Sequence, residues 1–199
     1  MLSVLSLTIN FRGSTTFGRK FQTMIWGDIG HWELEDMVAA RNWLVESGIA
    51  KPEAMILTGR SYGGYLTLLG LSKHPDLWVA GIAYVAIADW AMNYEDAIDA
   101  MKTAFNAWFK GTPKDKLESY RKSSPVTYAK HVKAPVAIIQ GYNDSRTTPR
   151  QMEVYVDKLK SLGKDVEIHW YDAGHGVPNI HEMIRLLELQ LKFVYRVLQ

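Results

Sequence analysis

The sequence contains no cysteine among its 199 residues. This absence excludes a disulfide framework and a thiol nucleophile. It is consistent with a reducing compartment, so we expect a cytoplasmic protein.

Long apolar runs and an excess of one charge are also missing. No stretch approaches the roughly 20 apolar residues of a membrane span. Residues 1–10 are interrupted by serine, threonine and asparagine, which indicates a strand rather than a signal peptide. The formal net charge is +2, with both signs interspersed. We therefore expect neither nucleic acid nor a membrane as a partner.

The sequence does contain enough apolar residues for one globular domain, which we expect to span residues 1–199; 47% are hydrophobic and 22% charged. Strand-like and helix-like segments alternate without a linker. Strands are predicted at 2–9, 54–58, 79–85, 135–140 and 166–170. Helices are predicted at 32–47, 65–71, 149–162 and from Pro178 onward, with a polar loop at 10–30 and a helical insertion at 92–132. This alternation predicts the α/β class, with a mostly parallel sheet covered by helices on both faces.

The most informative motif is Gly59-Arg60-Ser61-Tyr62-Gly63, which has the form G-x-S-x-G. It lies between a predicted strand and a predicted helix, the context in which this motif forms a nucleophile elbow. Such a turn exposes the serine hydroxyl, and the helix that follows offers free N–H groups to an oxyanion. We predict that Ser61 is a nucleophile and that the N–H of Tyr62 is an oxyanion donor. The alternative is a glycine-rich helix start without catalytic meaning.

A serine needs a base and an acid to act as a nucleophile. In α/β hydrolases these follow in the order Ser, Asp, His, each on a loop after a later strand. Asp144 follows the strand at 135–140, and His175 follows the strand at 166–170 between two glycines. We therefore predict a triad of Ser61, Asp144 and His175.

One alternative acid is Asp172, which would need a tight local loop to reach His175. A metal cluster of His169, Asp172, His175 and His181 has no familiar ligand spacing, so we expect neither metal nor cofactor. The remaining histidines have ordinary surface or structural interpretations; they are His31, His74, His131, His169 and His181.

Several stretches together resemble the catalytic domain of the prolyl oligopeptidase family, near its acylaminoacyl-peptidase and dipeptidyl-peptidase branch. They are Asn10-Phe11-Arg12-Gly13-Ser14-Thr15, Gly59-Arg60-Ser61-Tyr62-Gly63-Gly64-Tyr65, Ala88-Asp89-Trp90, Ser124-Pro125-Val126-Thr127-Tyr128, Gly141-Tyr142-Asn143-Asp144 and Ala173-Gly174-His175-Gly176. The resemblance implies the α/β-hydrolase fold and the same triad. It also implies that Trp90 and Tyr94 line an apolar S1 pocket; the alternative is that these rings pack helices onto the sheet.

The sequence departs from the family in two ways. It lacks the strand that ends in a His-Gly-Gly type loop and helps to form the oxyanion hole, and no repeat marks the β-propeller. The chain thus resembles a C-terminal portion of the catalytic domain. We expect Leu2–Ile9 to pair directly with the strand at 54–58, and an N–H of the Arg12–Thr15 loop to replace the lost donor. The alternative is a strand from a second chain, which would give a homo-oligomer.

These features predict a serine peptidase that hydrolyses short peptides or acyl-peptides through an acyl-enzyme. One alternative is a carboxylesterase, because the same triad cleaves esters more easily than amides. The other is a non-catalytic fragment or assembly module that retains the triad.

Overall fold

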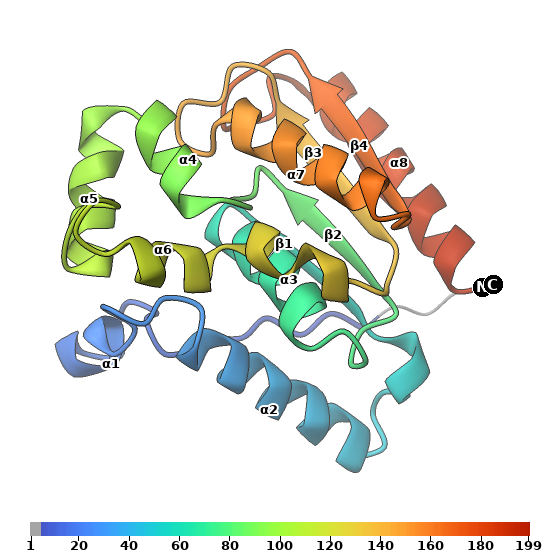
Figure 1. Ribbon diagram of the computed structural model, residues 1–199. Coiled ribbons are helices and arrows are strands. Elements are labelled where there is room, and N and C mark those ends of the chain that lie inside the picture. The colour runs from blue at the N-terminus through green and yellow to red at the C-terminus, as the bar shows by residue number, and fades with distance from the viewer. Residues whose placement is uncertain (1–4) are drawn as a thin grey trace.

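The computed structural model describes residues 5–199, and its centre is a parallel β-sheet (Figure 1). The strands are β1 (Ile56–Arg60), β2 (Ala80–Tyr84), β3 (Val136–Gly141) and β4 (Val166–Tyr171). They follow the order β1-β2-β3-β4, and every neighbouring pair is parallel. The four later strands predicted from the sequence are therefore confirmed. All four carboxyl ends meet at one edge, where ligands of such sheets bind.

Helices precede, connect and follow these strands. They are α1 (Arg19–Thr23), α2 (Trp32–Glu46), α3 (Tyr62–Lys73), α4 (Trp90–Asp96), α5 (Asp99–Phe109), α6 (Leu117–Ser123), α7 (Pro149–Ser161) and α8 (Ile180–Val197), with short 3₁₀ helices η1 (Pro52–Ala54) and η2 (Pro125–His131). The loop expected at 10–30 contains the short helix α1, and the predicted insertion consists of α4, α5, α6 and η2. The last helix begins two residues later than expected, because the side chain of Asn179 accepts a hydrogen bond from the Glu182 N–H at 2.9 Å.

Helices cover both faces of the sheet, as the alternating pattern predicts. On one face, Leu68 of α3 and Met152 of α7 pack with Ile138 of β3. On the other face, Phe193 of α8 packs with Ile82 of β2. Figure 1 shows α7 and α8 on opposite sides of the strands. The fold is thus an α/β-hydrolase sheet that places the loop after each strand at the same edge.

A second core lies between α3 and the helical insertion. It is rich in aromatic rings, and its buried members include Tyr65 of α3, Trp90 of α4 and Phe109 of α5. Trp90 contacts Tyr65 and Phe109 with ring centroids 5.0 and 5.3 Å apart. This cluster fixes the insertion against the helix that follows Ser61.

The expected first strand is not formed in the described residues. Residues 5–9 carry no strand, and in the part of the chain that the structure describes β1 pairs only with β2. The prediction of direct pairing with β1 is therefore wrong for residues 5–9, while residues 2–4 lie outside the described part. The physical reason is that strand residues need a ladder partner, and the side chains of Leu5 and Leu7 are exposed instead of packed on the sheet. None of the described helices is long and apolar enough to cross a membrane.

Candidate active site

Ser61 occupies a sharp turn between β1 and α3. Its backbone has φ 56° and ψ −116°, a conformation that a residue with a side chain rarely adopts. The turn is fixed by the Ser61 N–H, which donates to the Tyr84 carbonyl at the end of β2 (2.8 Å). The geometry agrees with the nucleophile elbow that the G-x-S-x-G motif predicts.

The glycines of the elbow differ in whether a larger residue could replace them. A Cβ on Gly59 would lie 2.3 Å from the Gly63 carbonyl oxygen, and one on Gly64 would lie 2.6 Å from the Tyr84 carbonyl oxygen. A Cβ on Gly63 would meet no atom within 4 Å. The turn therefore requires glycine at 59 and 64, whereas Gly63 borders open space.

The structure brings the three predicted triad side chains together. The His175 Nε2 lies 2.9 Å from the Ser61 Oγ, and the His175 Nδ1 lies 2.8 Å from the Asp144 Oδ2. Asp144 follows β3, and His175 follows β4, so all three come from carboxyl ends of strands. The imidazole can accept a proton from the serine while the carboxylate holds the opposite nitrogen.

Asp144 is held as an ionised hydrogen-bond acceptor. Its Oδ1 accepts from the Arg146 and Thr147 N–H groups at 2.8 and 3.0 Å, and its Oδ2 accepts from the Thr147 hydroxyl at 2.8 Å. Burial alone would raise the pKa of Asp144, but the bonds from His175, Thr147 and Arg146 lower it below its ordinary value. Sequence reasoning missed Thr147. The signal was present, because an aspartate followed by a short polar run commonly bonds the backbone two or three residues on.

The structure places Asp172 against Asn143 and not against His175. The Asp172 side chain is exposed, and its Oδ1 accepts from the Asn143 side chain at 3.2 Å. His175 is hydrogen-bonded to Asp144 instead. Asp144 is buried, with only 3% of its surface exposed.

Arg60 is a second residue that sequence reasoning left out. Its guanidinium donates to the backbone carbonyl of His175, which connects the elbow directly to the loop of the base. No local pattern predicts this contact, since the partners are 115 residues apart in the chain.

Tyr62 is the first residue of α3, so its N–H has no partner within the helix and points from the helix N-terminus. Three N–H groups of the Arg12–Thr15 loop, where the replacement donor is expected, already have hydrogen-bond partners. The N–H of Arg12 donates to Asp36 at 2.7 Å, that of Gly13 to Phe21 at 3.0 Å, and that of Ser14 to Phe11 at 2.9 Å. These three N–H groups are engaged in hydrogen bonds within the chain, so the prediction that one of them replaces the lost oxyanion donor is wrong.

Trp90 and Tyr94 do not line an open pocket together. Trp90 is 0% exposed and lies inside the aromatic core, so its prediction as a substrate-binding residue is wrong. The reason is that α4 directs this large ring inward against α3 and α5. Tyr94 is half-buried and packs edge-on against Tyr120, with ring centroids 6.1 Å apart.

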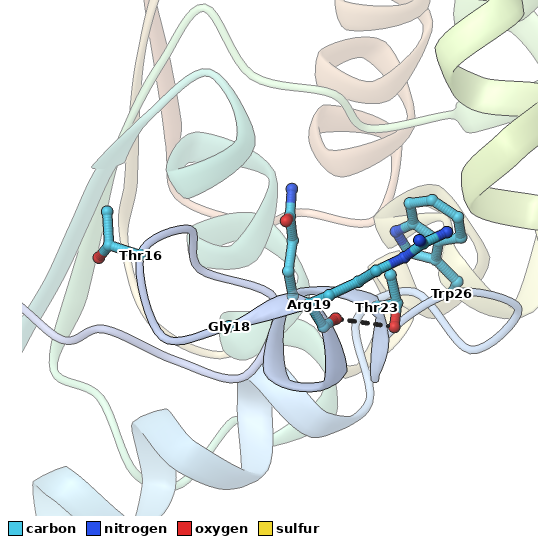
Figure 2. Close-up of a pocket in the computed structure, with 6 residues that line it drawn as sticks. Thr16, Gly18, Arg19, Thr23 and Trp26 are labelled. Carbon is cyan, nitrogen blue, oxygen red and sulfur yellow. Dashed lines mark hydrogen bonds between the residues drawn. The ribbon is translucent and has the colours of Figure 1, made fainter.

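A pocket of about 520 Å³ lies beside α1 (Figure 2). It is lined by Thr16, Gly18, Arg19, Gln22, Thr23 and Trp26, and none of these is a predicted site residue. Among these lining residues, the Thr23 hydroxyl donates a hydrogen bond to the Arg19 carbonyl at 2.9 Å. The pocket therefore belongs to the segment at 10–30 and not to the Ser61 site.

The parallel sheet and the serine-centred site define an α/β hydrolase. Residues 2–199 match the family model described as the prolyl oligopeptidase family. The chain belongs to this family of serine peptidases.

Individual proteins similar to this chain are also peptidases. Dipeptidyl aminopeptidase BIII of Pseudoxanthomonas mexicana is 29% identical over 175 residues, which cover 85% of this chain and 25% of that protein. The acylamino-acid-releasing enzyme of Arabidopsis thaliana is 27% identical over 168 residues, covering 81% of this chain and 22% of that protein.

Solved structures similar to this chain are peptidases as well. A puromycin-hydrolyzing peptidase of Mycobacterium tuberculosis superposes with a TM-score of 0.89 at 28% identity, covering 94% of this chain and 28% of that one. An acylaminoacyl peptidase of Pyrococcus horikoshii superposes with a TM-score of 0.86 at 28% identity, covering 96% of this chain and 34% of that one. The chain thus spans about a quarter of the curated relatives' length and up to about a third of the structural ones'.

Proposed function

We propose that the chain is a serine peptidase domain that hydrolyses short peptides or acyl-peptides through an acyl-enzyme. The observation that supports this most directly is the continuous hydrogen-bonded series from Asp144 through His175 to Ser61. The named activities of the relatives, on dipeptidyl, acylamino-acid and puromycin substrates, favour cleavage of an amide near a peptide end.

The first half-reaction follows from this geometry. His175 Nε2 accepts the proton of Ser61 Oγ as the oxygen forms a bond to the scissile carbonyl carbon. The carbonyl oxygen gains the negative charge and accepts a hydrogen bond from the Tyr62 N–H. The protonated His175, oriented by Asp144, then gives its proton to the leaving nitrogen as the carbon–nitrogen bond breaks.

The second half-reaction restores the site. Water gives a proton to His175 Nε2 while its oxygen attacks the acyl-ester carbon. His175 returns that proton to Ser61 Oγ as the ester bond breaks, and the free acid leaves.

A carboxylesterase is a second candidate function, supported by a specific observation. The N–H groups of Arg12, Gly13 and Ser14 are occupied, so they add no second donor to the Tyr62 N–H. Removing one oxyanion donor costs on the order of 10²–10³ in kcat. Ester substrates, with their better leaving groups, tolerate such a loss more easily than amides do.

A fluorophosphonate probe tests the proposal. We expect the wild-type chain to be labelled at Ser61, and Ser61→Ala to keep its fold but take no label and lose hydrolysis. Comparing p-nitrophenyl esters with aminoacyl and acyl-aminoacyl p-nitroanilides separates peptidase from esterase. A wild-type chain that is folded but takes no probe would instead show a non-catalytic module.

A further inference from the structure

A buried carboxylate lies directly behind the elbow. Glu33, in the first turn of α2, is 0% exposed. The Gly30 N–H donates to both of its oxygens, at 3.1 and 3.0 Å, and the Tyr62 hydroxyl donates to its Oε1. The ion pairs of residues 5–199 do not include Glu33.

A helix-capping role explains only part of this arrangement. A carboxylate in a first turn commonly bonds the backbone just before the helix, and this accounts for Gly30. It does not account for complete burial or for the bond to Tyr62, which belongs to another helix. A buried carboxylate without a cation is costly. Burial raises the pKa of Glu33, although the bonds from Tyr62 and Gly30 act in the opposite direction.

Tyr62 connects this carboxylate to the reacting serine. Its side chain is held by Glu33 at the hydroxyl and by rings along its length, with Tyr65 at 5.3 Å and Trp108 at 5.7 Å between centroids. Burial, with the nearby Glu33 adding to it, raises the pKa of Tyr62 well above its ordinary value, so the phenol stays protonated and donates. Its backbone N–H is the oxyanion donor of the proposed mechanism.

We propose that Glu33 is a positioning residue for the oxyanion donor. By holding the Tyr62 hydroxyl, it fixes the orientation of Tyr62 and therefore the direction of the N–H beside Ser61. An oxyanion donor acts by being aligned before the charge develops, so a small rotation lowers kcat without weakening substrate binding. This inference rests on the proposed function.

The test compares Tyr62→Phe, Glu33→Met and the double variant on p-nitrophenyl esters. Rates are divided by the number of serines that a fluorophosphonate titrates, so that misfolded protein is not counted. Loss of one positioning hydrogen bond predicts that kcat falls about tenfold while KM stays within about twofold. The double variant is expected to be no slower than either single variant, because both remove the same contact.

Two further variants separate positioning from general stability. Glu33→Gln keeps one oxygen that can accept from the Tyr62 hydroxyl, so we expect it to recover much of the kcat that Glu33→Met loses. Glu35→Gln changes the same charge at an exposed position two residues along α2, and kcat should not change.

The outcomes are distinguishable. A labelled wild-type chain whose Tyr62→Phe and Glu33→Met variants keep kcat per titrated serine would overturn this inference and leave the proposed function intact. Equal losses of kcat in all variants, including Glu35→Gln, would also overturn it. A folded wild-type chain that takes no probe would overturn the proposed function and this inference with it.

Discussion

Gly59 faces the Gly63 backbone across the elbow, and of these two positions only 59 requires glycine. A Cβ on Gly59 would approach the Gly63 carbonyl oxygen to 2.3 Å, whereas a Cβ on Gly63 would meet nothing within 4 Å. The two glycines of the G-x-S-x-G motif are therefore not equivalent: the turn requires glycine at 59 but not at 63.

This asymmetry predicts opposite effects of the same substitution. Gly59→Ala should lower the free energy of unfolding by about 3 kcal/mol or more, because the new methyl group collides with backbone that cannot move aside. Gly63→Ala should change it by no more than about 1 kcal/mol, in the stabilising direction, because alanine favours the helix. Urea unfolding followed by circular dichroism measures both. Equal destabilisation by the two substitutions would contradict the geometry.

The acid can be tested by a matched pair of aspartates. Asp144→Asn should keep the fold but lower kcat by about 10⁴, the loss known for this change in a serine protease triad. Asp172→Asn should leave kcat nearly unchanged, since its carboxylate bonds Asn143 and not His175. Ester hydrolysis per titrated serine is the measurement, and the reverse ranking would transfer the role to Asp172.

Asp144 should also make stability depend on pH. Its pKa is lowered below the ordinary 3.8 in the folded chain, so the unfolded chain binds more protons in the range between the two values. The stabilisation is therefore fully present above about pH 4 and is lost as pH falls through the folded pKa.

Urea unfolding from about pH 7 to about pH 2 measures this effect. The gap in unfolding free energy between the wild-type chain and Asp144→Asn should narrow as the solution becomes more acidic. A gap that stays constant over this range would show that Asp144 is not stabilised as an anion in the fold.

Trp90 should behave as a core residue. Trp90→Ala is expected to lower the free energy of unfolding by about 3–5 kcal/mol, because the ring is 0% exposed and contacts Tyr65, Phe105 and Phe109. Tyr94→Ala removes a half-buried ring and should cost less. A stable Trp90→Ala chain with a raised KM for apolar substrates would restore the substrate-binding interpretation.

Much of the site was determined by the sequence alone. Ser61 lies in a motif whose strand and helix context is local, and Asp144 and His175 directly follow strands that can be read from apolar runs. In a parallel sheet the carboxyl ends of strands meet at one edge, so their order along the chain was enough to predict that they converge.

The sequence predicted less well where a residue's partner is distant. Residues 5–9 have a strand-like pattern, but a strand forms only with a ladder partner, and the described residues supply none. Likewise, an aromatic residue such as Trp90 can line a pocket or fill a core, and only the packing of α4 against α3 and α5 settled which.

Two hydrogen bonds next to the site depend on the tertiary structure. Arg60 reaches the His175 carbonyl across 115 positions of sequence, and Tyr62 reaches Glu33 across 29. Local patterns arise from helix and strand periodicity, which relate residues a few positions apart. Hydrogen bonds between different elements carry no such period, so they become visible only when the elements are packed together.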